Sequence, residues 1–401
     1  MPLTSPWRTD FPGILALEAE GQTYLDSAAT AQKPQAVIDA LTAYYAAGAA
    51  NVHRAQHLPG ERATRAFEAV REQLAGWMNA ASSAEIIFTR GTTEAINLLA
   101  YGLEGQFQPG DELVISALEH HANLLPWQQL ALRKQLTLLV LPLDANGDPD
   151  LQAACQLIGP RTKLLAVSQL SNVLGRWTPL AALLQLARQH GAITVVDGAQ
   201  GAVHTRPDVR ALDCDFYAFS AHKLYAADGV GVLYARQSAA ERLSHWQFGG
   251  EMVLDADYQQ ARFRPTPLGF EAGTPAIASV LALGAALDYL QQLDSTAVLA
   301  HEQALHQQLL KGLRQRPGVR LLGAPQLALA SFTIDGLHGS DLAHLLGEQG
   351  ICLHNGHDCA MPLLKQFGLG GALRASIGLY NNGDDLQRFF DALDQAMDLL
   401  Q

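Results

Sequence analysis

The sequence predicts an α/β protein with two domains. The large domain has a mainly parallel seven-stranded sheet flanked by helices, and a smaller α+β domain lies at the C-terminal end. The chain has 401 residues, 48% of them hydrophobic, which is enough to bury a large core. Short apolar strand candidates alternate with helical patterns through the middle of the chain, as is typical of a parallel sheet wrapped by helices. After Pro275 the pattern changes to two long helices.

The N-terminal part begins with an arm, residues 1–20, which we expect to pack against the small domain. Thr23 to Asp26 has the pattern of a short strand, and Pro34 precedes a helix that continues to Ala47. Glu61 to Ala80 repeats apolar residues at helical spacing. We place the large domain at residues 21–280 and the small domain at residues 281–401.

Seven strand candidates make up the predicted large sheet. Helices such as Ala95 to Leu103 and Leu180 to His190 separate most of them. The strands are Ile86 to Thr89, Glu112 to Ser116, Leu136 to Leu141, Thr162 to Val167, Ile193 to Asp197, Phe216 to Ser220 and Gly231 to Tyr234.

The C-terminal part begins with the two helices Ala276 to Gln292 and Thr296 to Arg316. Its strand candidates are Ala328 to Ile334 and Ile351 to His354, and Asp384 to Leu400 is the closing helix.

The composition argues against several classes of function. The 27 basic and 39 acidic residues give a net charge of -12, without a lysine- or arginine-rich block, so nucleic acid and anionic membrane are poor partners. No apolar run approaches the roughly 18 residues of a membrane span, and the N-terminus lacks a secretory signal. We therefore expect a cytoplasmic protein. The four cysteines are too sparse for a disulfide framework and lack metal-ligand spacing, so we expect no metal site.

Lys223 ends the stretch Phe216 to Lys223, an apolar strand followed by a hydroxyl, an imidazole and an amine. Burial disfavours an ammonium ion, so a lysine just past a buried strand is a candidate nucleophile for a Schiff base. By itself it is better explained as a surface lysine, because solvated lysines greatly outnumber reactive ones.

Other candidates follow strands of the same sheet. Gly91-Thr92-Thr93-Glu94 opens a helix whose amides and hydroxyls can hold a phosphate, although a plain helix cap looks similar. Asp197 ends its strand, where a carboxylate can pair with a protonated pyridine nitrogen, or simply cap the next helix. Gln200 can hydrogen-bond the phenolic oxygen of such a ring.

Three further residues are weaker candidates alone. His120 can stack on an aromatic cofactor or move protons, or be an ordinary loop histidine. Cys359 can be a nucleophile activated by His357, or a small buried side chain. Arg374 can clamp a carboxylate. Together with Lys223 and Asp197, these residues describe a pyridoxal phosphate enzyme.

Runs of residues along nearly the whole chain resemble the aminotransferase class V cysteine desulfurases, most closely the SufS/CsdA type. The runs are Tyr24-Leu25-Asp26-Ser27-Ala28-Ala29, Asn51-Val52-His53-Arg54, Arg90-Gly91-Thr92-Thr93-Glu94, Glu119-His120-His121-Ala122-Asn123, Ser171-Asn172-Val173, Val196-Asp197-Gly198-Ala199-Gln200, His222-Lys223-Leu224-Tyr225, Phe270-Glu271-Ala272-Gly273-Thr274-Pro275 and Cys359-Ala360-Met361-Pro362.

The resemblance implies a fold type I homodimer with active sites at the subunit interface. It assigns catalytic roles to Lys223, which bonds the cofactor, to His120, which stacks on it, and to Cys359, which carries sulfur as a persulfide. The implied cofactor contacts are Thr92, Thr93, His120, Asn172, Asp197, Gln200, Ser220, His222, Lys223 and, from the other subunit, Thr274. The implied substrate contacts are Arg374, which holds the carboxylate, and Asn172, His53 and His354.

The implied reaction converts L-cysteine to L-alanine and passes the sulfur to an acceptor protein of the SufE/CsdE kind, for iron-sulfur cluster assembly or other sulfur transfer. Two alternatives stay open. One is cysteine sulfinate desulfinase or selenocysteine lyase activity at the same site. The other is a degenerate protein that serves as a scaffold for a sulfur-transfer partner.

The chain departs from the family pattern at three places. His354 stands where arginine is usual, and Asp358 replaces the histidine before the cysteine. A carboxylate at that position disfavours the thiolate unless its charge is directed elsewhere. Ala221 replaces a glycine, so we expect its φ to be negative. Ala226-Ala227-Asp228-Gly229 stands where Gly-Pro-Thr-Gly is usual, which adds a charge near the cofactor phosphate.

Overall fold

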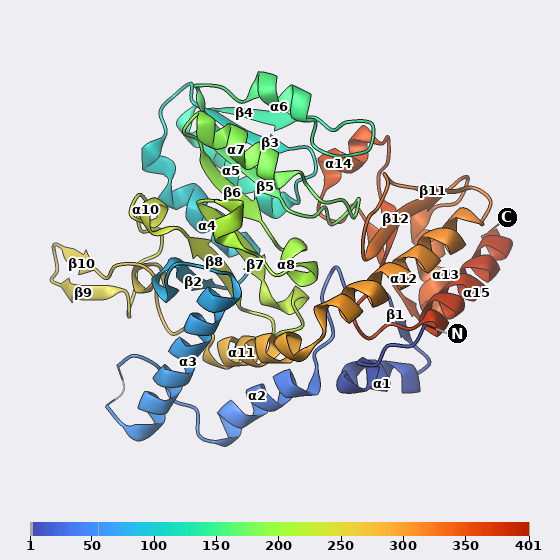
Figure 1. Cartoon of the computed structure of the whole chain (residues 1–401), viewed down its shortest axis with the longest axis horizontal. Helices are drawn as coiled ribbons and strands as arrows, with labels where there is room; N and C mark the ends of the chain where they lie inside the picture. Colours follow the sequence, from blue (N-terminus) through green and yellow to red (C-terminus); the bar gives the residue numbers. More distant parts are fainter. Residues whose placement is uncertain (1–2, 55, 401) are drawn as a thin grey trace.

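The structure is a computed structural model that describes residues 3–54 and 56–400. It has a large lobe built on the predicted seven-stranded sheet and a smaller C-terminal lobe beside it (Figure 1). The strand order is β2-β8-β7-β6-β5-β3-β4. β8 is antiparallel to both of its neighbours and the other pairs are parallel, so the expected α/β class and mainly parallel sheet are confirmed.

The strands of the large sheet are buried on both faces, except for the partly exposed edge strand β4, and this burial explains their continuous apolar sequences. They are β2 (Ile86–Thr89), β3 (Glu112–Ser116), β4 (Thr137–Leu141), β5 (Thr162–Ser168), β6 (Ile193–Asp197), β7 (Phe216–Ser220) and β8 (Gly231–Ala235). All seven agree with the predicted strands to within one residue at each end, and β2, β3, β6 and β7 agree fully.

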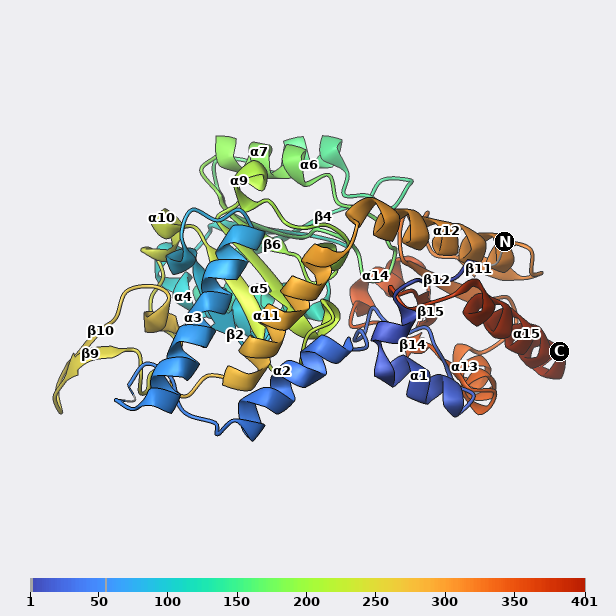
Figure 2. The ribbon, with the colours of Figure 1, turned by 60° about the horizontal axis from the view of Figure 1, so that its bottom comes forward.

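Helices cover the two faces of this sheet (Figure 2). One face packs against α2 (Gln35–Ala46), α3 (Leu58–Trp77), α7 (Leu180–Gln189) and α11 (Ile277–Gln292). The other packs against α4 (Thr92–Gly102) and α5 (His121–Lys134). Alternate residues of a strand enter the two cores: Tyr217 and Phe219 lie in the first, Phe216 and Ala218 in the second. Shorter helices on this lobe are α6 (Leu151–Leu157), α8 (Gly201–His204), α9 (Val209–Leu212) and α10 (Gln237–Ala240).

The smaller lobe has a four-stranded antiparallel sheet in the order β11-β12-β15-β14. Its strands are β11 (Val319–Leu321), β12 (Leu329–Ile334), β14 (His354–Gly356) and β15 (Ala372–Ser376). Its helices are α12 (Ser295–Arg314), α13 (Gly339–Glu348), α14 (Met361–Gln366) and α15 (Gly383–Leu400). A core of leucine and phenylalanine side chains lies between this sheet and the helices α12, α13 and α15.

The predicted strand Ile351 to His354 is in fact two strands of different sheets. β13 (Ile351–Cys352) pairs in parallel with β1 (Thr23–Tyr24), whereas β14 pairs with β15. The chain thus changes partners after Cys352. A local apolar pattern does not contain this information, because both partners are distant in sequence.

The N-terminal arm contacts the C-terminal lobe, and its first two residues lie outside the described residues. The Ser5 hydroxyl donates to the carbonyl of Leu379 at 2.5 Å, and Arg8 pairs with Asp385 at 2.9 Å. The arm's helix α1 (Pro12–Ala19) lies beside this lobe (Figure 1). The predicted domain boundary between residues 280 and 281 falls within α11, and the division into domains stays a prediction.

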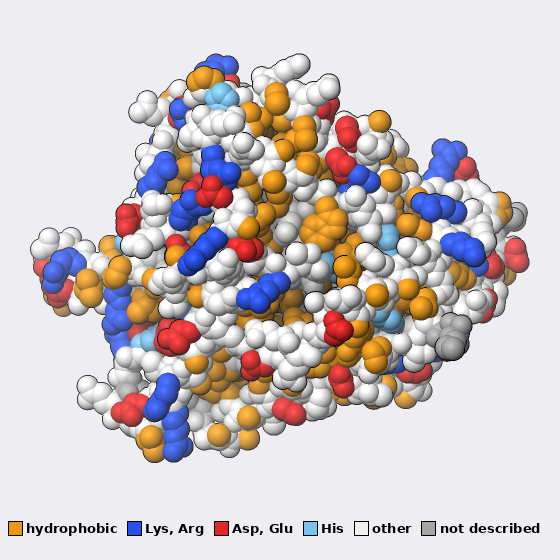
Figure 3. Space-filling model, viewed as in Figure 1, with side chains coloured by type: hydrophobic (Ala, Val, Ile, Leu, Met, Phe, Trp, Pro, Cys, Tyr) orange, Lys and Arg blue, Asp and Glu red, His pale blue; other side chains and the backbone are white. Residues whose placement is uncertain are grey.

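A hairpin that we did not predict, β9 (Val253–Ala256) with β10 (Ala261–Phe263), projects from the large lobe (Figure 1). Basic and acidic side chains are interspersed on the face shown in Figure 3. In the part of the chain that the structure describes, no helix is long and apolar enough to cross a membrane.

Candidate active site

A cavity of about 280 Å³ lies at the carboxyl ends of β5, β6 and β7, where open α/β sheets bind ligands. It is lined by Ala28, Ala29, Thr92, Thr93, His120, Ala122, Ser168, Leu170, Asn172, Asp197, Ala199, Gln200, Ser220, His222, Lys223, His354, Asp358, Cys359 and Arg374. The list contains every predicted site residue except His53 and Thr274. The structure therefore brings together residues that are up to 282 positions apart in sequence, from Thr92 to Arg374.

The N-terminus of α4 forms one end of the cavity. The Thr92 amide donates to Ser220 Oγ at 2.8 Å, and the two hydroxyl oxygens are also 2.8 Å apart. An added Cβ on Gly231 would lie 2.4 Å from Gly91 Cα, so the close approach of β8 to this helix start requires glycine. Together with the α4 dipole, these groups can hold a phosphate.

Asp197 lies in the floor of the cavity, with 5% of its surface exposed. Its Oδ1 accepts a hydrogen bond from the Ala199 amide at 2.9 Å, and burial raises the pKa of its carboxyl. Gln200 is equally buried and donates from Nε2 to the Ala28 carbonyl at 2.8 Å. A carboxylate held in this way can pair with the ring nitrogen of a pyridine.

Lys223 ends the 3-10 turn η4 (Ala221–Lys223) and lies next to the strand end, as expected. Burial lowers the pKa of its amine to about 8, although the Asp197 carboxylate acts in the opposite direction and raises it. At neutral pH this lysine has a much larger free-amine fraction than an exposed lysine.

His120 caps α5 by accepting from the Ala122 amide at 3.0 Å, and burial lowers the pKa of its imidazole to about 4. It is therefore neutral near pH 7. The preceding Glu119 is buried, and its carboxylate accepts from Asn123 Nδ2 at 2.6 Å and from the Ser168 amide at 3.0 Å. Glu119 thus joins the start of α5 to the end of β5. Sequence analysis assigned it no role, although it adjoins His120.

Cys359 is exposed and lies in the loop between β14 and α14. Its carbonyl accepts from the His121 amide at 2.6 Å, and the carbonyl of Asp358 accepts from Asn172 Nδ2 at 2.8 Å. Asp358 and Cys359 have φ values of 49° and 52°, a conformation that costs about 1 kcal/mol or more for each non-glycine residue. The loop that carries the thiol is thus held by the large lobe.

Arg374 lies on β15 and is surrounded by acceptors. Its Nη1 lies 2.7 Å from Asp358 Oδ1 and donates to the Asn172 carbonyl at 3.0 Å, while its Nη2 lies 3.4 Å from Asp26 Oδ1. His354 lies 3.3 Å from Asp26 and 3.7 Å from Asp358, and its hydrogen bond to Asp26 raises the pKa of its imidazole. The charge of Asp358 is thus directed toward Arg374 and His354. Sequence analysis did not single out Asp26.

Two predicted site residues lie elsewhere. His53 pairs through Nε2 with Glu68 at 2.7 Å, and Thr274 lines another cavity, with Trp246 and Glu271. The roles predicted for both residues stay predictions.

Ala221 lies in a 3-10 turn, whose φ is negative, in agreement with the negative φ that we expected for it. Asp228 is exposed, and its charge opposes the lowering of the pKa of His222 by burial.

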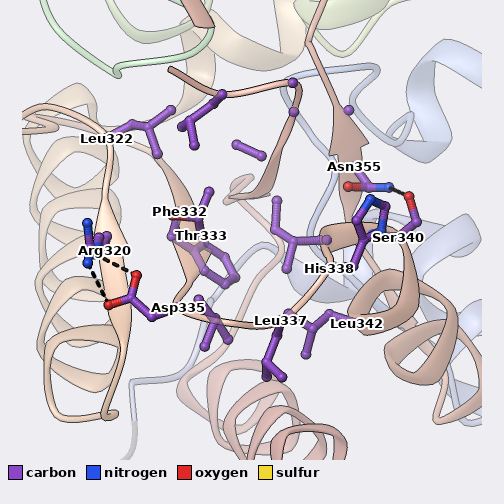
Figure 4. Close-up of a pocket in the computed structure, with 18 of the residues that line it drawn as sticks. Arg320, Leu322, Phe332, Thr333, Asp335, Leu337, His338, Ser340, Leu342 and Asn355 are labelled. Carbon is purple, nitrogen blue, oxygen red and sulfur yellow. Dashed lines mark hydrogen bonds and ion pairs between the residues drawn. The ribbon is translucent and has the colours of Figure 1, made fainter. Parts of the chain in front are cut away.

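A separate cavity of about 620 Å³ lies in the smaller lobe (Figure 4). Its wall includes the exposed ion pair of Arg320 and Asp335 at 2.6 Å and the contact of Asn355 with Ser340 at 3.3 Å. None of the predicted site residues lines it.

The residues of the active-site cavity fit pyridoxal phosphate. The helix start with Thr92 and Ser220 suits the phosphate, the buried Asp197 suits the pyridine nitrogen, and Lys223 suits the aldehyde. No group of three or more histidine, cysteine or acidic residues in the described ranges could hold a metal ion.

Comparison with known proteins supports the same chemistry. Residues 23–389 match the family described as Aminotransferase class-V. The chain is 67% identical to a probable cysteine desulfurase of Pseudomonas putida, over 99% of both chains. It is similar to the crystal structure of the cysteine desulfurase CsdA from Escherichia coli, with a TM-score of 0.93 and 41% identity over 98% of both chains. An apo cysteine desulfurase from Thermococcus onnurineus NA1 has a TM-score of 0.92 and 34% identity, again over 98% of both chains.

Proposed function

The chain belongs to the aminotransferase class-V family, and on this basis we propose that it is a pyridoxal phosphate-dependent cysteine desulfurase, which converts L-cysteine to L-alanine and carries the sulfur as a persulfide on Cys359. One observation supports the proposal above all others: a thiol, Cys359, and a lysine with a lowered pKa, Lys223, line the same cavity as Asp197 and Arg374.

The cofactor supplies an electron sink for the carbanion at the substrate's α-carbon. Thr92, Thr93, Ser220 and His222 would hold its phosphate, and Asp197 would keep a proton on the pyridine nitrogen. Lys223 would hold the cofactor's aldehyde, and its amine, with a lowered pKa, would serve as the base that takes the α-proton of the substrate. The neutral imidazole of His120 lies in the cavity wall, where it would stack on the cofactor ring.

Arg374 receives the α-carboxylate of the substrate, because its guanidinium fork suits a planar carboxylate. The Cys359 thiolate then attacks the substrate sulfur, so that a new sulfur-sulfur bond forms as the carbon-sulfur bond breaks. Protonation of the remaining three-carbon unit yields alanine. Cys359 is exposed, so a SufE/CsdE-like acceptor protein can take up the transferred sulfur.

We further propose that the enzyme is a homodimer. Thr274, predicted to reach the cofactor from the other subunit, lies outside the cavity within its own chain. An active site shared between two subunits explains this position.

The function is tested by two measurements on purified protein. The first is the visible absorbance of lysine-bound cofactor, which should be lost in Lys223→Ala. The second is the formation of alanine from cysteine, cysteine sulfinate and selenocysteine, together with sulfide, sulfite or selenide respectively, in wild type and Cys359→Ala. Cysteine desulfurase activity should depend on Cys359. Cys155→Ala, which removes the other exposed thiol, is the matched control.

The outcomes separate the alternatives. Activity on cysteine sulfinate or selenocysteine that survives Cys359→Ala, without activity on cysteine, would favour those substrates. A protein that stays colourless with added cofactor would contradict every enzymatic function and favour the scaffold.

A further inference from the structure

The Asp358 carboxylate occupies the place at Arg374 where a substrate carboxylate should bind. The side chain of Asp358 has no exposed surface, that of Arg374 is 3% exposed, and their charged atoms are 2.7 Å apart. Both residues line the active-site cavity with Cys359. A buried carboxylate is thus already present next to the arginine that we assign to the substrate.

The contact between the two side chains is an ion pair with poor hydrogen-bond geometry. Among the described residues, neither oxygen of Asp358 has a hydrogen-bond partner, and Arg374 Nε has none either. A carboxylate that meets the guanidinium fork squarely makes two parallel hydrogen bonds. Asp358 therefore does not use all the hydrogen-bond donors of the Arg374 guanidinium. A carboxylate that is free to choose its position can make better hydrogen bonds to this guanidinium.

Arg374 already has two carboxylate neighbours, because Asp26 lies 3.4 Å from the guanidinium that also contacts Asp358 at 2.7 Å. A third negative charge at this position is costly unless one of the acids withdraws or takes up a proton. His354 can serve as a second ion-pair partner for Asp358, because its Nε2 lies 3.7 Å from Asp358 Oδ1.

We propose that Asp358 is a specificity-determining residue that competes with the substrate for Arg374. This inference rests on the proposed function. In the free enzyme, Asp358 pairs with Arg374. When substrate binds, its α-carboxylate takes the guanidinium and Asp358 turns toward His354. Because Cys359 is the next residue, substrate binding also releases the thiol loop from one of its attachments.

Propionate is a suitable probe, because it has a carboxylate but no amine to react with the cofactor. Its dissociation constant is measured by calorimetry on the cofactor-loaded protein. Asp358→Asn keeps the size of the side chain and removes its charge, so we expect about tenfold tighter binding than in wild type. The matched control is Asp228→Asn, which removes an exposed charge in the loop after Lys223. This substitution should change the dissociation constant for propionate less than twofold.

The neutral analogue propionamide shows whether charge is responsible, and Asp358→Asn should not tighten its binding. Equal propionate affinities in wild type and Asp358→Asn, or binding by neither protein, would overturn the proposal. So would an equal gain in Asp228→Asn. Unchanged cofactor absorbance in Asp358→Asn verifies that the variant is folded.

Release of the loop is tested by alkylation of Cys359 with iodoacetamide, followed for each cysteine by mass spectrometry. Propionate should accelerate the modification several-fold in wild type but not in Asp358→Asn, in which the loop is already released. The exposed Cys155 is the internal reference. A rate at Cys359 that does not respond to saturating propionate in wild type would contradict the coupling. Neither experiment requires turnover, so their failure is distinguishable from failure of the desulfurase assay.

Discussion

The side-chain amide of Asn172 donates a hydrogen bond to the backbone carbonyl of Asp358 at 2.8 Å. The two residues lie 186 positions apart, one just after β5 of the large sheet and the other next to the thiol. The backbone carbonyl of Asn172 also accepts from Arg374 at 3.0 Å. One buried asparagine thus holds both the loop of Cys359 and Arg374.

Asn172→Ala should therefore loosen the thiol loop. Loss of a buried hydrogen bond of this kind costs roughly 1–3 kcal/mol, so we expect kcat/KM for cysteine to fall about tenfold to a hundredfold. Alkylation of Cys359 should become faster while the cofactor absorbance persists. The control is Asn146→Ala, in an exposed turn. An unchanged alkylation rate would show that Asn172 does not hold the loop.

Glu119 should make the stability of the protein depend on pH. Burial raises the pKa of its carboxyl to about 7, so between its ordinary pKa of 4.5 and about 7 the folded state holds a proton that the unfolded state has lost. The contribution of Glu119 to stability therefore decreases as pH rises through this window, by up to about 3 kcal/mol.

The measurement is urea unfolding of wild type and Glu119→Gln from pH 4.5 to 8. Wild type should have its largest advantage over the variant at the acidic end of this range. Glu61→Gln, an exposed change in α3, should show no such trend. A difference between wild type and Glu119→Gln that does not vary with pH would disprove the role of this proton.

Lys223 should capture the cofactor at a lower pH than an ordinary lysine does. Because its pKa is lowered to about 8 by burial, its reactive free amine is lost as pH falls below 8 and not below 10.5. The rate at which apoprotein takes up pyridoxal phosphate, followed by absorbance, should be half-maximal near pH 8. Lys33→Met, which removes a half-buried lysine whose pKa is also lowered, should leave this inflection in place. An inflection near 10.5 would contradict the effect of burial.

Arg71 should be important for stability because it is 2% exposed and pairs with Glu271 at 2.6 Å. Glu271 also accepts from the Phe88 amide at 2.7 Å, and it begins the segment that leads to Thr274. Arg71→Met leaves a buried carboxylate without its partner, so the free energy of unfolding should fall by about 3–5 kcal/mol.

Chemical denaturation measures this effect. Arg320→Met, which removes the exposed pair with Asp335, is the control and should change stability by less than about 1 kcal/mol. Equal effects of the two substitutions would mean that burial of the Arg71 pair does not matter.

Much of the fold could be predicted because most strands of the large sheet are buried on both faces. Each strand is then a short apolar run between turn residues, a local signal that marked β6 and β7 correctly. The ends of these strands also placed Asp197 and Lys223 at one edge of the sheet, because the carboxyl ends of parallel strands meet there. The hairpin of β9 and β10 was missed, since it is short and exposed and has no such pattern.

The amino-acid sequence by itself determined the α/β class, the position of the site at the strand ends and most of the polar residues that line it. Only the tertiary structure decided where the charge of Asp358 is directed, and that Glu119 joins α5 to β5. The physical reason is that ion pairs and buried hydrogen bonds depend on atoms that come within about 3 Å only after folding. Asp358 and Arg374 lie on different segments of the chain, and only the pairing of β14 with β15 brings them together.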